Sequence, residues 1–281
     1  MKSSIDQITS IPPAITEPLS NPMGLFNVTG KTALVVGASG SFGRGVALAL
    51  ASLRVNVMLC SGSSGEMNAV AEEVRSLRVG GVAAFVRRPD SLEDVEAMLE
   101  ATLEAFGAID MLVIASGLNK PGFIHEQSYE DWQAVMDANV KGSWLLCKTV
   151  GSYWIKHKVV GKVLMMSSVR GRHGNYSGYG GYCTSKAATD GLTRVLATEW
   201  ARHGITVNSI APTVFRSKLT EWMYGDNEVG QQTRARSLSR IPMGRLGEVE
   251  DLIGMAIYLL SPASAFCTGQ IMYVDGGYTA A

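Results

Sequence analysis

Short runs of apolar residues alternate with longer segments in which apolar positions recur every three or four residues. The alternation begins at Lys31 and continues almost to the carboxyl end. The longer segments predict amphipathic helices, and several short runs are too continuously apolar for a strand with one wet face. The pattern therefore predicts an α/β fold, in which helices cover both faces of a parallel sheet.

Seven apolar runs are candidate strands. We predict them at Thr32–Val36, Val55–Cys60, Val82–Val86, Met111–Ala115, Lys162–Ser167, Thr206–Ile210 and Gln270–Val274. Helical periodicity predicts helices at Phe42–Leu53, Gly65–Leu77, Leu92–Phe106, Tyr129–Lys156, Gly181–His203 and Val249–Leu260. Crossovers of this length require right-handed parallel connections, so we predict one Rossmann-like domain with a doubly wound sheet of about seven strands.

Two segments break the alternation. Residues 1–24 are rich in Ser, Pro and Thr and lack periodicity, which predicts a flexible arm before a domain of residues 25–281. Residues 211–247 contain Pro212, polar turns and a short amphipathic piece around Leu219–Tyr224. Because this long segment follows the carboxyl end of a strand, we expect it to form a lid over the site.

The chain has 281 residues, of which 46% are hydrophobic, and its 25 Lys and Arg balance 25 Asp and Glu. This balance leaves no basic surface for a phosphate backbone, so we expect a small-molecule partner and no nucleic acid. No apolar run reaches about 18 residues and no signal-like start is present, so we expect neither a membrane span nor secretion. Four separated cysteines lack the paired spacing of a zinc site, which predicts reduced thiols, a cytoplasmic location and no metal.

A glycine-rich turn follows the first predicted strand and leads into a helix. Glycines allow a tight turn and close backbone approach, while the free N–H groups and positive dipole end of the helix attract a pyrophosphate. The position of this turn in the chain, more than its letters, predicts dinucleotide binding. The candidate contacts are Gly37, Ser39, Gly40, Ser41, Phe42 and Gly43.

The second predicted strand ends in small residues where a dinucleotide would place its adenosine ribose. The candidate contacts are Ser61, Gly62 and Ser63, and the first carboxylate after them is Glu66. An acid at the strand end would bond a ribose 2′-hydroxyl and repel a 2′-phosphate, so its absence favours NADP, with NAD as the alternative. Three nearby arginines are interpreted as solvated surface charges: Arg44, Arg87 and Arg88.

Tyr182 and Lys186 lie four residues apart at the start of a predicted helix. Positions at this spacing share a helix face, so the ammonium can stand beside the phenol. A neighbouring positive charge favours phenolate and should lower the tyrosine pKa from its usual value of about 10. Tyr182 is therefore the candidate general acid/base, exchanging a proton with an alcohol or a carbonyl.

Two further polar residues are candidates for the same site. Ser168 follows the strand that precedes Tyr182, where a hydroxyl can hold the substrate oxygen, and we choose it over Ser167. Asn139 lies mid-helix, where asparagine is a mediocre former, and could bind a carbonyl or a water that relays protons to Lys186. Together with the tyrosine and the lysine, these side chains would form one catalytic group.

In their order along the chain, these motifs resemble those of the short-chain dehydrogenase/reductase family, over about Gly30–Ala281. The catalytic residues of the family fall on Asn139, Ser168, Tyr182 and Lys186, and further matches are Ile205–Pro212 and Tyr273–Gly277. The resemblance implies that the tyrosine donates or accepts the proton and that the serine positions the substrate oxygen. It also implies that the lysine binds the nicotinamide ribose and lowers the tyrosine pKa.

The segment after the sixth predicted strand resembles the branch that includes gluconate 5-dehydrogenase and related polyol and cyclic-alcohol dehydrogenases. The similarity covers residues 212–217 and continues over residues 219–223. The cofactor contacts that it implies are Pro212, Thr213 and Val214 beside the nicotinamide, with Ser217 at the pyrophosphate.

The chain departs from the family pattern at four places. Ser41 stands where the family has the middle glycine of its loop, and Ile-Ala-Ser-Gly, ending at Gly117 beside the cofactor, replaces Asn-Asn-Ala-Gly. Arg88 replaces an aspartate that often bonds adenine, and Thr213 replaces a glycine. These departures suggest altered cofactor handling.

We therefore predict an NAD(P)-dependent oxidoreductase that interconverts a secondary alcohol and a ketone, acting on a polyol, a sugar acid or a cyclic alcohol. The alternative is a non-catalytic dinucleotide-binding sensor or assembly subunit of the same fold. The predicted substrate contacts are Ser168, Tyr179, Phe215, Leu219 and Trp222, on a wall that also holds Met223, Tyr224, His173, Asn175 and Tyr176. The family resemblance further implies a homotetramer, with the helices at 129–156 and 181–203 as interfaces.

Overall fold

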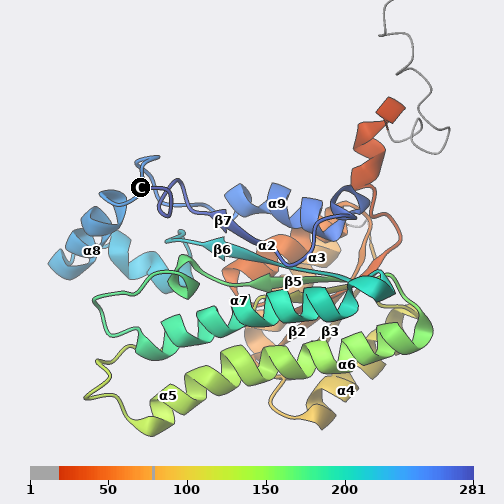
Figure 1. The fold of residues 1–281 in the computed structure, drawn as a ribbon, viewed down its shortest axis with the longest axis horizontal. Helices are drawn as coiled ribbons and strands as arrows, with labels where there is room; N and C mark the ends of the chain where they lie inside the picture. The colour runs from red at the N-terminus through yellow and green to blue at the C-terminus, as the bar shows by residue number, and fades with distance from the viewer. Residues whose placement is uncertain (1–18, 78–79) are drawn as a thin grey trace, which may run out of the picture.

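The computed structural model describes residues 19–77 and 80–281, and at residues 218 and 219 it describes the backbone alone. Its strands form one parallel sheet in the order β3-β2-β1-β4-β5-β6-β7 (Figure 1). The strands are β1 Thr32–Val36, β2 Asn56–Ser61, β3 Val82–Val86, β4 Met111–Ile114, β5 Lys162–Met166, β6 Thr206–Pro212 and β7 Ile271–Val274. The order reverses between β1 and β4, and such a switch point is where α/β sheets bind ligands at the carboxyl ends of their strands.

Helices cover both faces of the sheet (Figure 1). The α-helices are α2 Ser41–Ser52, α3 Ser64–Ser76, α4 Leu92–Phe106, α5 Tyr129–Met136, α6 Gly142–His157, α7 Gly180–Trp200, α8 Glu228–Leu238 and α9 Glu250–Leu260. Short helical segments are η1 Pro22–Phe26, η2 Asp137–Lys141, η3 Val169–Gly171, η4 Ala201–His203, η5 Lys218–Tyr224 and η6 Pro262–Ser264; η2 is a π-helix and the others are 3₁₀-helices.

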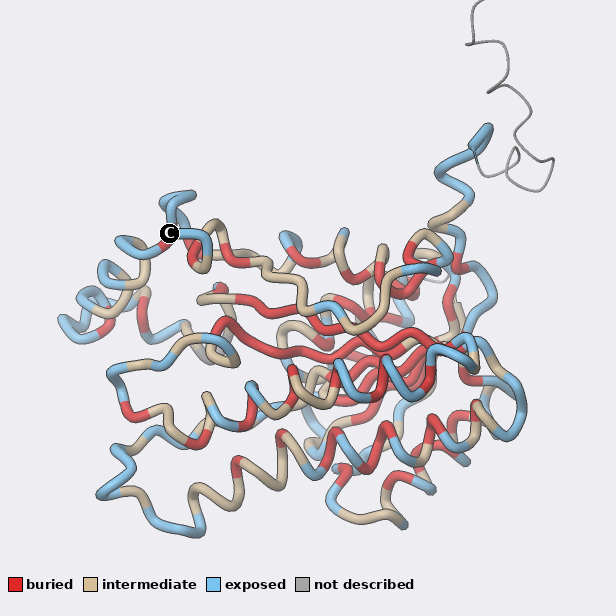
Figure 2. The backbone as a smooth tube through the Cα atoms, in the orientation of Figure 1, coloured by how far each residue is buried: buried red, intermediate tan, exposed pale blue. Residues whose placement is uncertain are grey.

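The hydrophobic core has two layers, one on each face of the sheet (Figure 2). The central strands β1, β2, β4, β5 and β6 are buried along most of their length, whereas the edge strands β3 and β7 are partly exposed. Alternate residues of β1 supply the two layers, because successive side chains of a strand point to opposite faces. Ala33 and Val35 pack with α2, α3 and α9, whereas Leu34 and Val36 pack with α4, α6 and α7. This burial on both faces explains why the strands are continuously apolar in sequence.

The predicted fold class is confirmed, and each predicted strand lies within two residues of its observed bounds. The prediction was wrong at two helices. The predicted helix Tyr129–Lys156 is divided by the π-turn η2, and α8, within the predicted lid, was not foreseen. Its sequence carries little apolar periodicity, and Gly230 is the only residue of α8 that is buried.

Most of the predicted amino-terminal arm lies outside the described residues. Its described end enters η1, and the ring of Phe26, the last residue of η1, lies 6.5 Å from that of Tyr258 on α9. Among the helices that the structure describes, none combines the length and apolar character needed to cross a membrane.

Candidate active site

The predicted catalytic side chains converge at the carboxyl ends of β4 and β5 and the start of α7. Ser168 follows β5 and is buried, and its Oγ accepts a hydrogen bond from the backbone N–H of Arg170 (3.1 Å). Tyr182 lies in the first turn of α7, where the Ser168 hydroxyl interacts with its phenol. The Nζ of Lys186 lies 5.5 Å from the centre of the Tyr182 ring. The structure therefore brings this serine, tyrosine and lysine together.

The pKa of Tyr182 is raised above its ordinary value in the chain alone, which corrects the expectation that it would be lowered. Burial of the phenol is the largest cause, because a buried phenolate loses its hydration. Hydrogen bonding by Ser168 and the positive charge of Arg170 offset part of this effect. The Nζ of Lys186 lies over the ring, 5.5 Å from its centre, and donates to the carbonyl oxygen of Met166, and its positive charge does not reverse the rise in the pKa of Tyr182.

Lys186 is 5% exposed, and its Nζ donates a hydrogen bond of 2.6 Å to the carbonyl oxygen of Met166 at the end of β5. Burial lowers the pKa of this ammonium to about 8, while the carboxylate of Asp190 acts in the opposite direction. Lys186 is thus mostly protonated at neutral pH and titrates within reach of an alkaline assay.

Asn139 lies in the π-turn η2, and its buried side chain is fully engaged. Its Nδ2 donates to the carbonyl oxygen of Leu118 and to Oγ of Ser185, both at 2.9 Å, while its Oδ1 accepts from the N–H of Leu118 at 2.7 Å. Single π-turns inside helices are frequent at functional sites. Asn139 therefore joins the segment after β4 to α7, next to Gly117, which lies beside Lys186.

The two adjacent serines of the predicted pair face different neighbours. Ser167 Oγ donates a hydrogen bond of 2.5 Å to Oδ1 of Asp190, and both residues are buried. The pKa of the Asp190 carboxyl group is raised, mainly by burial, and the hydrogen bond from Ser167 offsets part of this rise. Ser167 is thereby held against α7, and Ser168 is the hydroxyl beside Tyr182.

The glycine-rich turn has the close backbone packing that its sequence suggested. Gly37 has φ +84°, and a side chain there would come within 2.3 Å of the N–H nitrogen of Ser116. A Cβ at Gly43 would lie 2.3 Å from the carbonyl oxygen of Gly37, whereas one at the exposed Gly40 would lie 3.3 Å from the same oxygen. The displaced glycine of the family pattern therefore leaves the tight turn intact.

The end of β1 and the start of α2 fit the pyrophosphate of a dinucleotide. The first N–H groups of α2, from Ser41 onward, have no carbonyl partner within the helix, and Gly40 places no capping side chain over them. Oγ of Ser39 and Oγ of Ser61 share a hydrogen bond of 2.7 Å, which ties this turn to the end of β2. Gly62 and Ser63 follow directly, and Ser63 precedes α3 without capping it.

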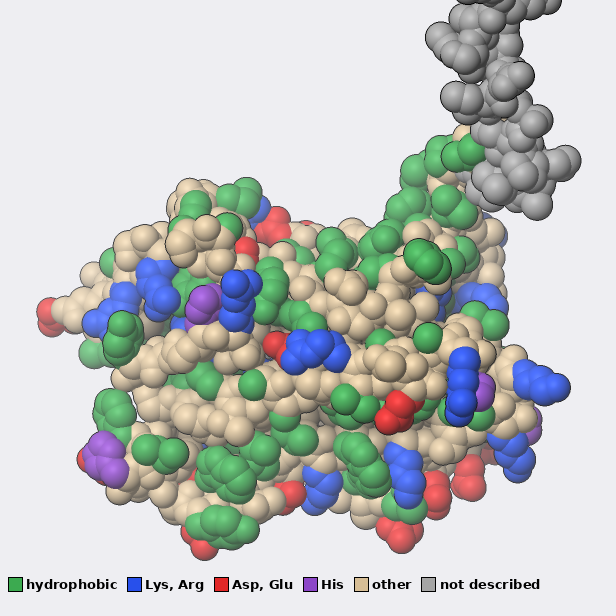
Figure 3. Space-filling model, viewed as in Figure 1, with side chains coloured by type: hydrophobic (Ala, Val, Ile, Leu, Met, Phe, Trp, Pro, Cys, Tyr) green, Lys and Arg blue, Asp and Glu red, His purple; other side chains and the backbone are tan. Residues whose placement is uncertain are grey.

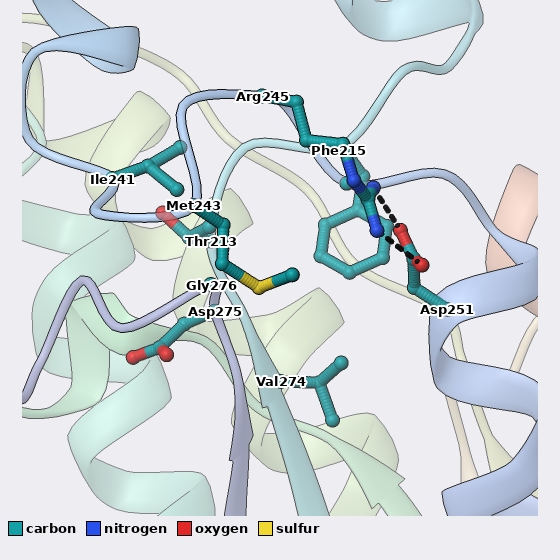
Figure 4. Close-up of a pocket in the computed structure, with 10 residues that line it drawn as sticks. Thr213, Phe215, Ile241, Met243, Arg245, Asp251, Val274, Asp275 and Gly276 are labelled. Carbon is teal, nitrogen blue, oxygen red and sulfur yellow. Dashed lines mark hydrogen bonds and ion pairs between the residues drawn. The ribbon is translucent and has the colours of Figure 1, made fainter.

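The segment after β6 borders a pocket of about 190 Å³ between the ends of β6 and β7 and the loop at 241–247 (Figure 4). Thr213 and Phe215 line it, and the Met243 side chain points into it. Arg245 and Asp251 close one edge with hydrogen bonds of 2.6 and 2.8 Å. None of the four predicted catalytic residues lines this pocket.

The other predicted cofactor contacts of this segment have partners of their own. Pro212 ends β6, and its carbonyl oxygen accepts a hydrogen bond from Ser168 Oγ at 3.5 Å. Val214 pairs with the N–H of Gly247 at 3.1 Å. The Ser217 N–H donates to Oγ1 of Thr220 at 2.9 Å in a capping box that starts η5, so its contact with pyrophosphate stays a prediction.

The predicted substrate contacts differ widely in exposure. Tyr179 precedes α7, and its ring centre lies 6.1 Å from that of Tyr182. Trp222 is 48% exposed, but Phe215 is 4% exposed and packs edge-on against Phe42 at 5.4 Å. Phe215 thus anchors the lid to α2 as well as lining the pocket. The Leu219 side chain lies outside the described residues.

The sequence model of the family described as enoyl-(acyl carrier protein) reductase matches residues 37–279. This is a model of short-chain dehydrogenases and reductases, and it covers the turn, the convergent side chains and the lid described above. The chain belongs to the short-chain dehydrogenase/reductase family. The expected resemblance is thereby confirmed.

Similar members of the family cover almost the whole chain. An uncharacterised oxidoreductase of Mycobacterium tuberculosis is 49% identical over 255 residues, 91% of this chain and 93% of that protein. The gluconate 5-dehydrogenase of Gluconobacter oxydans is 32% identical over 263 residues, 93% of this chain and 99% of that protein. The crystal structure of a gluconate 5-dehydrogenase from Burkholderia cenocepacia, in complex with NADP and tartrate, is 28% identical. It matches with a TM-score of 0.84 over 92% of this chain and 99% of that one.

Two polar residues of this short-chain dehydrogenase/reductase were missed in the sequence. Ser185 accepts from Asn139 and donates to the carbonyl oxygen of Tyr182 at 2.8 Å, and Asp190 holds Ser167. Their spacing from the tyrosine, three and eight residues along one helix, is the signal that could have found them, because both positions share its buried face. Family members bind NAD or NADP, and the turn and helix start described above fit that group.

Proposed function

We propose that this protein interconverts a secondary alcohol and a ketone by NADP-dependent hydride transfer, with Tyr182 as the general acid/base. The convergence of Ser168, Tyr182 and Lys186 at the carboxyl ends of the strands carries the proposal. A phenol beside a hydroxyl and an ammonium can exchange a proton with an oxygen held between them. The fold alone would not support this, since the same sheet serves many functions.

Each residue of the group has a separate role in this proposal. The Ser168 hydroxyl binds the substrate oxygen and orients it toward Tyr182, which donates the proton in ketone reduction and accepts it in alcohol oxidation. Lys186, fixed by the Met166 carbonyl, supplies positive charge beside the phenol and donates to the nicotinamide ribose. When bound, the nicotinamide supplies or accepts the hydride.

Asn139 is a positioning residue in this proposal, which takes up the carbonyl binding that the sequence suggested and leaves the binding of a relay water a prediction. Its three hydrogen bonds join Leu118 to Ser185 and leave the amide engaged with protein. It thereby fixes the path of the chain after β4 along the side of Lys186.

NADP is favoured over NAD because no carboxylate stands at the end of β2. The bound NADP of the Burkholderia structure supports the same choice. Contacts with the dinucleotide are expected from the turn and first residues of α2, the end of β2, Gly117 and the segment after β6.

A sugar acid has the most support among the three substrate classes. The guanidiniums of Arg170 and Arg240 lie 5.6 and 4.6 Å from the ring centre of Tyr278, and neither pairs with an acid among the described residues. Basic side chains and a histidine gather at this end of the molecule (Figure 3). Arg170 also lies near enough to lower the pKa of Tyr182, so a carboxylate held there would sit beside the proton donor.

The substitution Tyr182→Phe tests the catalytic role. We expect NADPH binding, followed by nicotinamide fluorescence, to remain within about twofold, and ketone reduction to fall at least 100-fold, as typical for general acid/base groups. Tyr258→Phe is the matched control, because Tyr258 lies on α9 with its ring facing Phe26, outside the predicted site. Wild-type protein should be assayed with gluconate and its ketone, an uncharged polyol, a cyclic alcohol and a 3-oxoacyl thioester.

The alternative function is a dinucleotide-binding sensor or assembly subunit. Saturating NADPH binding without turnover on any substrate of this panel would favour it over the oxidoreductase. Equal rates for wild type and Tyr182→Phe would also overturn the assigned role of the tyrosine.

A homotetramer is part of the proposal. Large apolar side chains are exposed on the helices predicted to form its interfaces: Tyr129 on α5, Trp144 on α6 and Val195 on α7, at 68%, 48% and 52%. Such exposure marks surfaces that bury themselves against partners. A monomer in sedimentation at working concentration would exclude this assembly.

A further inference from the structure

The ends of β2 and β3 lie side by side, and an arginine that follows β3 lies against a glycine that follows β2. Ser61 pairs in register with Val86, so Gly62 and Arg88 follow as neighbouring loop residues. A Cβ placed on Gly62 would lie 2.2 Å from Nε and 2.5 Å from Cγ of Arg88. The arginine side chain therefore occupies the space that a side chain at Gly62 would fill.

Three arginines were interpreted as solvated surface charges, and the structure separates them. Arg44 makes a two-pronged ion pair with Glu73, and Arg87 binds Asp94 at 2.7 Å. Within residues 19–77 and 80–281, Arg88 makes no hydrogen bond and no ion pair. Its guanidinium is thus the one cation of the three that is free for a ligand.

The free guanidinium lies where the proposed cofactor carries its distinguishing group. A dinucleotide on the start of α2 places its adenosine ribose at the end of the second strand, which here is tied to the phosphate turn through Ser39 and Ser61. A carboxylate in that place would bond the 2′-hydroxyl, whereas a nearby arginine accommodates a 2′-phosphate. Here the second strand offers only Ser61, Gly62 and Ser63.

We propose that Arg88 binds the 2′-phosphate of NADP, reaching from the end of β3 across Gly62. This inference rests on the proposed function, because it assumes that the dinucleotide binds at the turn after β1. A planar guanidinium can donate two parallel hydrogen bonds to a phosphate. Gly62 contributes by having no side chain, which lets the arginine lie against the backbone at the end of β2.

The experiment measures dissociation constants of NADPH and NADH by nicotinamide fluorescence, and of 2′,5′-ADP and ADP by calorimetry, for wild type and variants. In Arg88→Ala we expect the NADPH and 2′,5′-ADP constants to rise roughly 10- to 100-fold, as for the loss of charged hydrogen bonds. Binding of NADH and ADP should stay within about twofold. Arg87→Ala is the matched control and should leave all four constants unchanged, because Asp94 already holds that charge.

Gly62→Val provides a second variant that keeps the arginine but displaces it. Gly62→Val should weaken the binding of 2′,5′-ADP more than the binding of ADP. An unchanged melting temperature of Arg88→Ala and of Gly62→Val would show that the fold is intact.

Four results would overturn the assignment. Equal weakening of NADPH and NADH in Arg88→Ala would mean a general role in the adenosine site, and tighter binding of both would mean that Arg88 obstructs it. Selective NADPH binding that survives Arg88→Ala would place the phosphate contact elsewhere while leaving the proposed function in place. If wild-type protein binds neither dinucleotide, the proposed function itself fails, and this assignment with it.

Discussion

The two sides of the candidate active site are held in different ways. On the side of β5 and α7, buried polar side chains bond one another and the backbone, as Asn139 does with Leu118 and Ser185. On the lid side, α8 buries only Gly230, and Tyr224 is held by the exposed charge of Arg216, 4.6 Å from its ring centre. The contrast teaches that the proposed proton chemistry sits on a fixed frame, while the exposed positions of the lid can change sequence at little cost in stability.

A substitution on the side of β5 and α7 should have the largest effect on the free energy of unfolding. Asn139→Ala removes three hydrogen bonds and leaves the half-buried backbone groups of Leu118 without their protein partner, so the free energy of unfolding should fall by about 3 kcal/mol. Urea unfolding measures this change. Asn68→Ala, on the exposed face of α3, is the control and should stay within about 0.5 kcal/mol. A similar small change at Asn139 would mean that water replaces the amide and that this side is not fixed.

The buried ammonium of Lys186 should make the free energy of unfolding depend on pH. Its pKa is lowered from 10.5 to about 8 on folding, so between these pH values the unfolded chain binds more protons and the free energy of unfolding rises with pH. At about 1.4 kcal/mol per unit, the full gain is about 3 kcal/mol, complete by pH 10.5 and absent below pH 8.

This gain is measured as the difference between wild type and Lys186→Met in urea unfolding at pH 8 and 10.5. The difference should increase in favour of wild type over that interval, whereas the exposed Lys156→Met should track wild type at both pH values. Parallel curves for wild type and Lys186→Met would mean that the ammonium is hydrated in the folded protein.

The lid should show the smallest effect on stability. Trp222→Ala removes a side chain that is 48% exposed, so we expect a change within about 0.5 kcal/mol in unfolding free energy. If Trp222 contacts substrate, KM should rise severalfold with kcat nearly unchanged, as for the loss of uniform binding. Initial rates with the substrate found in the panel check this. A large loss of stability would show that the lid is as firmly fixed as the frame.

Much of the fold could be predicted because it rests on local periodicity. Burial on both faces made the strands continuously apolar, and a capping box at Ser91 and a left-handed Gly107 bound α4 at the residues expected from the pattern. The polar α8 could not be found in this way, because its formation depends on lying against η5 rather than on an apolar stripe of its own.

The residues of the candidate site could be predicted from the sequence, but the direction of the Tyr182 pKa shift and the pairing of the arginines could not. Spacing alone placed Tyr182 near Lys186, since the helix fixes that relation. The direction of the Tyr182 pKa shift depends on how deeply the phenol is buried, which sequence does not specify. Likewise, only the three-dimensional pairing of Arg44 and Arg87 with acids reveals that Arg88 is different.

The number of residues in the π-turn at Asp137–Lys141 sets the orientation of the helix that follows it. One residue of a regular helix corresponds to a rotation of about 100°, so a single extra residue in a turn changes which face the following helix presents. Before the turn α5 packs on α7, and after it α6 packs on α4 while Trp144 faces solvent. Deleting one residue here would rotate α6 against its partner, so the number of residues in this stretch is constrained independently of which residues they are.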